Sequence, residues 1–108
     1  MLNSILNEIG IPSRESRFIK TPTAPFIVYF DAVEARGADD VNLIREHGVT
    51  FELYTDKNND LSKETIAKIE NALDSRGIPY TKSDRVYIEA ESYYQTTFDF
   101  DYIEKREV

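Results

Sequence analysis

The sequence predicts a single α+β domain over residues 1–108, with two helices packed on one face of a mainly antiparallel four-stranded sheet. Three observations predict this fold class. The length suits one domain with a modest core. Two segments place apolar residues at helical spacing, and four others have the apolar runs or the alternation of strands. The elements follow the order αββαββ, and two helices can bury their apolar stripes together against one face of such a sheet.

The two predicted helices cover residues 2–9 and about 61–76, and they end in the same way. Each is followed by the letters GIP, at 10–12 and 77–79. Glycine readily adopts the left-handed conformation that ends many helices, and proline cannot continue a helix. The apolar stripes consist of Leu2, Ile5, Leu6 and Ile9 in the first helix and of Leu61, Ile66, Ile69, Ala72 and Leu73 in the second.

The four predicted strands are residues 26–33, 49–55, 85–91 and 93–104. The first opens with five apolar residues, which is typical of a strand covered on both faces, and the others alternate apolar with polar residues. Tyr54 and Tyr93 fall on polar faces, which predicts exposed tyrosines suited to an interface. Residues 13–25 and 34–48 are expected to be long loops, the second with a short helical turn near residues 41–45.

Composition and charge exclude several classes of function. The chain has no cysteine and a single histidine, so disulfides, thiolate chemistry and multi-histidine metal sites are excluded. Its net charge of −7 makes it a poor general binder of nucleic acid, because phosphate contacts need a basic surface. No apolar run approaches the roughly 20 residues that span a bilayer, and the N-terminus lacks the basic flank of a secretory signal. We therefore expect a cytoplasmic protein without cofactor, membrane contact or specific nucleic-acid binding.

The segment DKNNDLSKE, residues 56–64, raises the question of a calcium site. Its first, third and fifth side chains are acids or amides, as in an EF-hand loop. Leu61 stands where that loop needs glycine, and Ala67 stands where it needs a bidentate carboxylate. We therefore expect only a turn before the second helix, with Asp60 or Ser62 as the capping residue.

Two features suggest catalysis, and both have a simpler interpretation. His47 lies in a predicted surface loop, and no GxSxG motif supplies the nucleophile of a serine hydrolase. Carboxylates alternate along the last two strands at a spacing of about 7 Å, which is compatible with a glycosidase pair. Such alternation is also typical of the solvated face of an antiparallel sheet. We expect no enzyme activity, and we interpret as a solvated or interfacial face the residues Glu89, Glu91, Asp99 and Asp101.

Three segments together resemble a family of small phage proteins. They are PFIVYF at 25–30, GADDVNLIREHGVTFELYTDKNND at 37–60 and IPYTKSDRVYIEAESYYQTTFDFDY at 78–102. The set is similar to tail-terminator proteins, also called tail-completion or head-tail joining proteins, of long-tailed phages and prophages of Gram-positive bacteria. The most specific part is the strand end ELYTD, followed by a helix and by a tyrosine-rich hairpin.

The resemblance implies a structural role without reaction or cofactor. Such proteins have an αββαββ-type fold and form a ring, typically a hexamer, on the last ring of the tail tube. The ring stops tail polymerisation and offers a surface to which the filled head attaches. The implied partners are further copies of the chain, the major tail protein and a head-tail connector protein. The implied location is the bacterial cytoplasm during assembly and the neck of the virion afterwards.

Charged segments supply the candidate interfaces of such a ring. A locally basic loop that could contact an acidic patch on a neighbour carries Arg14, Arg17 and Lys20. The long 34–48 loop is a second candidate, because loops of that length are often functional. Its charged residues include Asp39, Asp40 and Arg45. An acidic pore would let DNA pass without sticking, and the candidate pore residues are Glu89, Glu91, Asp99 and Asp101.

Three other functions remain open from the sequence. The first is a neighbouring head-tail connector or neck protein, because these are also small, acidic and α+β. The second is a small acidic inhibitor that mimics DNA, although the mixed charges of the basic loop and of the second helix argue against it. The third is a small hydrolase built on the paired carboxylates.

Overall fold

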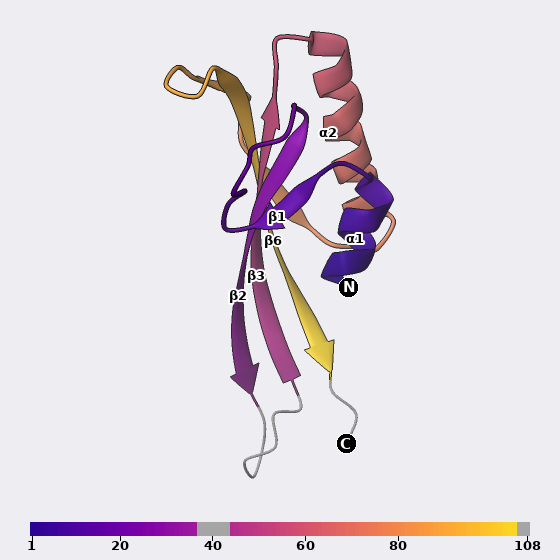
Figure 1. Cartoon of the computed structure of the whole chain (residues 1–108). Coiled ribbons are helices and arrows are strands. Elements are labelled where there is room, and N and C mark those ends of the chain that lie inside the picture. Colours follow the sequence, from indigo (N-terminus) through magenta and orange to yellow (C-terminus); the bar gives the residue numbers. More distant parts are fainter. Residues whose placement is uncertain (37–43, 106–108) are drawn as a thin grey trace.

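The computed structural model describes residues 1–36 and 44–105. Two helices and six strands follow one another along this part of the chain (Figure 1). In chain order they are α1 (Leu2–Ile9), β1 (Ser13–Glu15), β2 (Phe26–Arg36), β3 (Ile44–Thr55), α2 (Asn59–Asp74), β4 (Tyr80–Lys82), β5 (Val86–Ile88) and β6 (Tyr93–Lys105).

The strands form one mixed sheet around three long antiparallel strands. The order is β1-β2-β3-β6-β4, and β5 pairs with the upper end of β6. The strand β1 runs parallel to β2, and the other pairings are antiparallel. Across the three long strands, Phe51 of β3 lies between Tyr29 of β2 and Phe98 of β6. Residues directly opposite one another share a face, so this register defines the two faces of the sheet.

The chain is α+β, but the predicted four-stranded sheet and its αββαββ order were wrong. The sheet has six strands, and its β1–β2 pair is parallel. The missed strands β1 and β4 each have three residues, too few to show an alternating pattern. The strand β1 falls inside the predicted 13–25 loop, where its backbone is held by residues 27–29 of β2.

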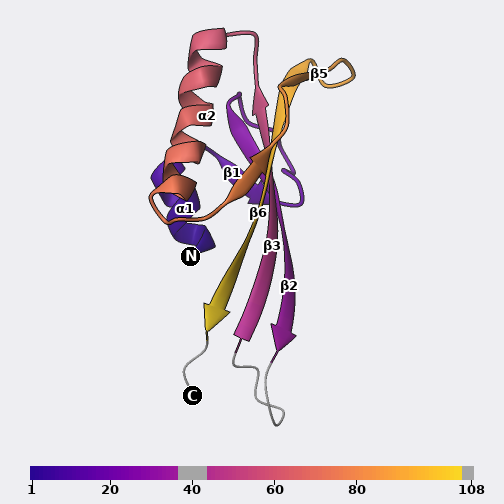
Figure 2. The same ribbon diagram turned by 180° about the vertical axis from the view of Figure 1, so that it is seen from behind.

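Both helices cover one face of the sheet and enclose the main core (Figures 1 and 2). Three fully buried side chains from the two centre strands, Phe51, Leu53 and Phe98, form the floor of this core. The helices contribute their predicted apolar stripes, of which the buried members are Ile5, Leu6, Ile9, Ile69, Ala72 and Leu73. Burial of such side chains is the main stabilising term in the fold.

The predicted helix ends are confirmed. Gly10 has a φ of 73°, and its N–H donates to the Leu6 carbonyl at 3.1 Å. Gly77 has a φ of 66°, and the N–H of the next residue, Ile78, donates to the Leu73 carbonyl at 3.1 Å. Both glycines therefore adopt the left-handed conformation that ends a helix. The second helix begins at Asn59 rather than at residue 61, because its capping residue is Asn58, two positions before the predicted Asp60.

The opposite face of the sheet carries a second, smaller apolar cluster at its upper end. Phe26, Val28 and Tyr54 are buried there, and Phe18 and Tyr93 pack against them. The rings of Phe26 and Tyr54 stack with centroids 5.1 Å apart. The prediction of an exposed tyrosine was therefore wrong for Tyr54, which is 9% exposed, whereas Tyr93 is half-buried with its ring against Phe26.

The predicted 34–48 loop was wrong for its described residues, 34–36 and 44–48, which are strand. The strand β2 continues to Arg36 and β3 begins at Ile44, and the two are paired along their whole length. The expected helical turn is wrong at residues 44 and 45, and its other residues lie outside the described part of the chain. The predicted 85–91 strand is shorter, at Val86–Ile88. Backbone pairing with neighbouring strands, which residue patterns do not show, extends β2 and β3.

Candidate functional site

The lower half of the sheet is a three-stranded extension that we call the ribbon: residues 30–36 of β2, 44–50 of β3 and 99–105 of β6. It extends past both helices (Figures 1 and 2). The outer strands β1 and β4 pair with residues 27–29 and 98–100 only. Within residues 1–36 and 44–105, most of each ribbon edge therefore has no strand beside it. Open edges and bare faces of this kind are typical of surfaces that meet another chain.

The helix-side face of the ribbon is organised around His47. The predicted surface-loop position of this residue was wrong, because His47 lies in β3 and is 8% exposed. Its Nδ1–H donates to the Asp31 carboxylate, with both oxygens at 2.9 Å, and its Nε2 lies 3.4 Å from Glu104 Oε1. Its ring stacks on Tyr102 with centroids 4.3 Å apart and planes 6° from parallel. Four side chains from three strands thus hold the ribbon together.

The surroundings of Tyr102 favour its neutral form. Burial is the main reason that the pKa of Tyr102 is raised to about 12, and the Asp31 and Glu104 carboxylates add to the rise. A hydrogen bond with the backbone of Leu2 acts in the opposite direction and places the phenol beside the start of α1. Within the described chain no hydroxyl or thiol group is hydrogen-bonded to His47, so the contacts of this cluster are those that join three strands.

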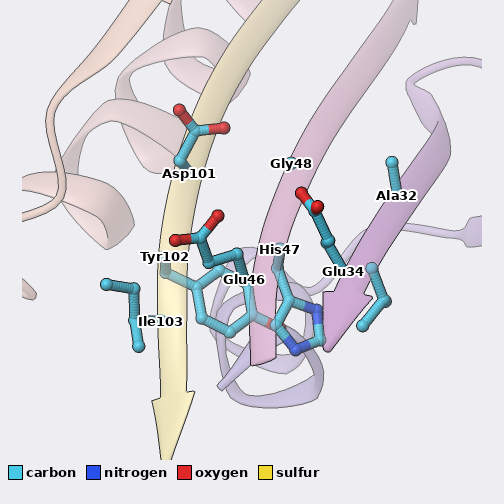
Figure 3. A pocket seen from close by; sticks show the side chains of 9 residues that line it. Ala32, Glu34, Glu46, His47, Gly48, Asp101, Tyr102 and Ile103 are labelled. Atoms are coloured by element: carbon cyan, nitrogen blue, oxygen red, sulfur yellow. The ribbon is translucent and has the colours of Figure 1, made fainter. Parts of the chain in front are cut away.

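The other face of the ribbon has an open pocket above Gly48 (Figure 3). Carboxylates from three strands surround it, from Glu34 of β2, Glu46 of β3 and Asp101 of β6. A Cβ added to Gly48 would lie 3.5 Å from Asp101 Oδ1, so the pocket exists partly because this residue has no side chain. No three His, Asp or Glu side chains within 1–36 and 44–105 are grouped closely enough to hold a metal ion.

Two of the four predicted pore acids lie on the ribbon. Asp99 and Asp101 are exposed on the face away from the helices, as the alternation of β6 predicts. Asp99 accepts a hydrogen bond from Thr50 Oγ1 at 2.6 Å. Glu89 and Glu91 lie in the β5–β6 turn rather than on a strand. The structure therefore does not bring the four carboxylates together on one strand pair.

Glu91 lies at the upper end of the sheet, where it lines a pocket with Arg17 and Tyr54. Burial raises the pKa of Tyr54, and the carboxylates of Glu52 and Glu91 raise it further, while a hydrogen bond from Gln95 lowers it. The predicted basic residues Arg14, Arg17 and Lys20 are all exposed. Arg14 lies opposite Val28, which places it on the face away from the helices.

The second predicted interface is only partly described. Asp39 and Asp40 lie outside the described residues. Arg45 lies in β3 on the helix-side face of the ribbon, 4.0 Å from Glu104 at the closest N–O distance. Both side chains are about 40% exposed, so this ion pair contributes little to stability.

The DKNND segment, residues 56–60, is a turn held by hydrogen bonds from a residue that the sequence pattern did not predict. Asn58, rather than the predicted Asp60 or Ser62, caps α2 by accepting a hydrogen bond from the Leu61 N–H at 3.1 Å. Arg85 donates to the Asp56 carbonyl, to Asn59 Oδ1 at 2.8 Å and to other oxygens of this turn. No local signal could have found Arg85, because it lies 26 positions away from Asn59.

Comparison with known proteins leaves the family of the chain open. No family model matches the sequence, and no curated protein matches it significantly. Within the part of the chain that the structure describes, no helix is long and apolar enough to cross a membrane. The ribbon and its charges are therefore the observations from which a function can be argued.

Proposed function

We propose that the chain is a structural tail-terminator protein of a phage or prophage, which assembles as a ring on the tail tube and joins it to the head. The observation that carries the proposal is the ribbon. It extends past both helices (Figure 1) and exposes apolar side chains. Phe30 is 42% exposed, Val33 50% and Ile103 60%. Apolar residues on an extended, open-edged sheet favour an assembly protein over a free monomeric enzyme.

The charges of the ribbon also favour this function. Asp99 and Asp101 are exposed on the uncovered face, and Glu34 lies on the same face of β2. A surface of this sign repels phosphate groups, so DNA could move along it without binding. We propose that these carboxylates line the pore of the ring. Glu89 and Glu91, in the β5–β6 turn, would lie at its upper rim.

The partners follow from the same role. The ring would contact further copies of the chain, the major tail protein below and a head-tail connector protein above. Among the described residues, those that we propose for these contacts are Arg14, Arg17, Lys20 and Arg45. The chain would act in the host cytoplasm during assembly and in the virion neck afterwards, without catalysis or a cofactor.

A reconstituted tail tests this proposal. Purified major tail protein is allowed to polymerise with increasing amounts of the chain, and tube lengths are measured by electron microscopy. We expect shorter tubes that each carry a ring at one end. A variant with both Phe30→Asp and Ile103→Asp should not shorten the tubes, whereas Asp74→Lys, on the exposed surface of α2, should act like the unaltered chain. Tubes of unchanged length at every concentration would contradict termination.

A further inference from the structure

The outer edge of β6, on the side away from β3, is open below β4. The strand β4 pairs only with residues 98–100 of β6. Just above that pairing, the Ser83 N–H donates to the Thr97 carbonyl at 2.9 Å, so the backbone groups of Thr97 point to this outer edge. Alternate residues of an antiparallel strand direct their backbone groups to the same side. The residues that do so below β4, with no strand of 1–36 or 44–105 beside them, are Asp101, Ile103 and Lys105.

The side chains of these three residues form one short row on the face away from the helices. Alternation from the buried Phe98 places them there, and all three are exposed, Ile103 by 60%. Asp101 and Lys105 make no ion pair with any residue in 1–36 or 44–105. Four residues along a strand span about 13 Å, so these two charges cannot pair with each other. The row therefore presents an acid, an apolar side chain and a base to solvent.

This row is complementary to itself. When a second β6 lies antiparallel beside the first with Ile103 at the centre, Asp101 of each copy lies opposite Lys105 of the other. Ile103 then lies opposite Ile103 of the second copy. The backbone groups of all three residues point toward the second strand, so each opposite pair exchanges two hydrogen bonds. Opposite charges and apolar side chains that lie directly across an antiparallel pair stabilise it.

The open part of the edge also has the length that this pairing needs. Residues 101–105 of the second copy occupy the part that β4 leaves open, and the β4 strands of the two copies border the pairing at its two ends. The open edge of β2 is not complementary in this way, because pairing about its centre, Val33, brings no opposite charges together. The opposite residues there would be Asp31 with Ala35 and Ala32 with Glu34. The charges therefore select the β6 edge and a second copy as its occupant.

We propose that two free copies of the chain pair their β6 edges at residues 101–105 around a two-fold axis, which gives one continuous sheet. The inference goes beyond the proposed function and concerns the chain before it meets the tail. Edge pairing leaves both faces of the sheet uncovered, so the carboxylates of Glu34 and Asp99 stay open to solvent.

The dimer and the proposed ring are successive states of the chain. A two-fold axis makes both ends of an assembly alike, whereas the proposed ring meets a different protein at each end, so the dimer separates before the ring forms. Asp101 leaves its ion pair at that point and is free to face the pore. Until then, the dimer covers an edge that would otherwise pair with any exposed strand.

Charge reversal at either end of the row tests the dimer. One variant carries Asp101→Lys and the other Lys105→Glu, and in each of them both charged pairs become pairs of like charges. In analytical ultracentrifugation at low salt, the unaltered chain should be a dimer at micromolar concentration. Each variant should raise the dimer Kd by about tenfold or more. Glu34→Lys, which changes the charge equally on the same face of β2, lies outside the pairing and should leave the Kd within about twofold.

An equal mixture of the two variants restores the complementary charges. The introduced lysine of one variant then lies opposite the introduced glutamate of the other, and Lys105 of the first lies opposite Asp101 of the second. Native mass spectrometry should therefore detect a one-to-one heterodimer. A chain that carries both changes should dimerise like the unaltered chain. Circular dichroism establishes that each variant folds.

A proline at the centre of the row tests the backbone pairing separately from the charges. Ile103→Pro removes an N–H that points to the outer edge, so the bonds between β6 and β3 remain and the dimer should be lost. The matched control is Val33→Pro on β2. The Ile27 N–H donates to the Pro12 carbonyl, and alternation from Ile27 places the Val33 N–H at the outer edge of β2 as well. This control should dimerise like the unaltered chain.

Four results would each overturn the proposal. They are a monomeric unaltered chain, a dimer that survives charge reversal, a mixture of the two variants that stays monomeric, and a dimer that is lost through Val33→Pro but not through Ile103→Pro.

The dimer and the tail-terminator role can fail separately. Ultracentrifugation and the mixing experiment use the purified chain alone, whereas termination is measured on tail tubes. A dimer without tube shortening would leave this inference standing and remove the function. Tube shortening by a chain that never dimerises would do the reverse.

Discussion

Replacing His47 with alanine should loosen the ribbon while leaving the main core intact. His47 is 8% exposed, bridges the carboxylates of β2 and β6, and stacks on Tyr102. Its removal deletes the hydrogen bond to Asp31 and the stacked ring pair, and it leaves the Asp31 carboxylate, which is 14% exposed, without its imidazole partner.

The expected loss can be worked from these contacts. A hydrogen bond to a charged group contributes about 1.5–3 kcal/mol. A stacked aromatic pair adds about 0.5–1.5 kcal/mol. The free energy of unfolding should therefore fall by about 2–4.5 kcal/mol, a large part of the roughly 5–15 kcal/mol typical of a whole domain.

Urea unfolding followed by circular dichroism measures this loss, and hydrogen exchange locates it. Ribbon amides of β2, β3 and β6 should exchange faster in His47→Ala, while the amides of α2 change less. Ile103→Ala is the matched control, because its side chain lies on the same ribbon but is 60% exposed. A double-mutant cycle with Asp31→Ala should show coupling between the two residues. A loss below about 0.5 kcal/mol for His47→Ala, no larger than for the control, would refute the bridging role.

Three further predictions concern stability. Thr96→Val should raise the free energy of unfolding by about 1 kcal/mol, because Thr96 Oγ1 is buried without a hydrogen-bond partner among the described residues. An unchanged or lower melting temperature of the variant would contradict this prediction. The Tyr80 hydroxyl donates to Glu70 Oε2 at 2.7 Å, and mainly for this reason its pKa is raised to about 12. The hydrogen bond should contribute fully to stability below the unfolded pKa of 10.0. Between pH 10 and 12 only the unfolded chain ionises at this residue, so the free energy of unfolding should fall. Urea unfolding of Tyr80→Phe should show a shallower fall over this pH range, and an identical fall would exclude Tyr80 as its cause. Arg85→Ala should lower the free energy of unfolding in urea by about 1–3 kcal/mol. Arg85→Lys should recover little of this loss, because an ammonium group cannot replace a guanidinium group that reaches several oxygens and lies over the Tyr94 ring, 3.8 Å from its centroid. Full recovery by lysine would show that only the charge matters.

Local patterns were sufficient for the helices and for the centre of the sheet. The period of 3.6 places Ile5 and Ile69 in the core, and the glycines at positions 10 and 77 end both helices as expected. The alternation of β3 and β6 correctly places Phe51 and Phe98 inside. In each case the residue's own neighbours in the chain determine its environment.

The ribbon and the short strands could not be predicted in this way. Glu34 and Arg45 are charged residues that suit a loop as well as a solvated strand, and only backbone pairing between β2 and β3 decides between the two. His47 is buried by Asp31 and by a β6 residue 57 positions away, Glu104. Long-range contacts of this kind leave no periodic signal in the sequence.

The four candidate carboxylates show the same difference between what local alternation predicts and what it does not. The exposure of Asp99 and Asp101 follows from simple alternation on β6, and the structure agrees. Glu89 and Glu91 follow the same alternation in the sequence but lie in a turn, because β5 ends at Ile88. The strand ends three residues before the predicted residue 91, which removes both carboxylates from it, and boundaries of this precision are beyond residue patterns.

The most direct test of the tail-terminator role is the length of tails in a phage or prophage from which this gene is deleted, measured by electron microscopy. The account predicts tails of uncontrolled length beside DNA-filled heads without tails, and normal particles when the gene is restored. Tails of normal length lying apart from heads would instead place the protein at a head-tail connector. Intact, normal virions would contradict a role in the neck and would favour an acidic inhibitor.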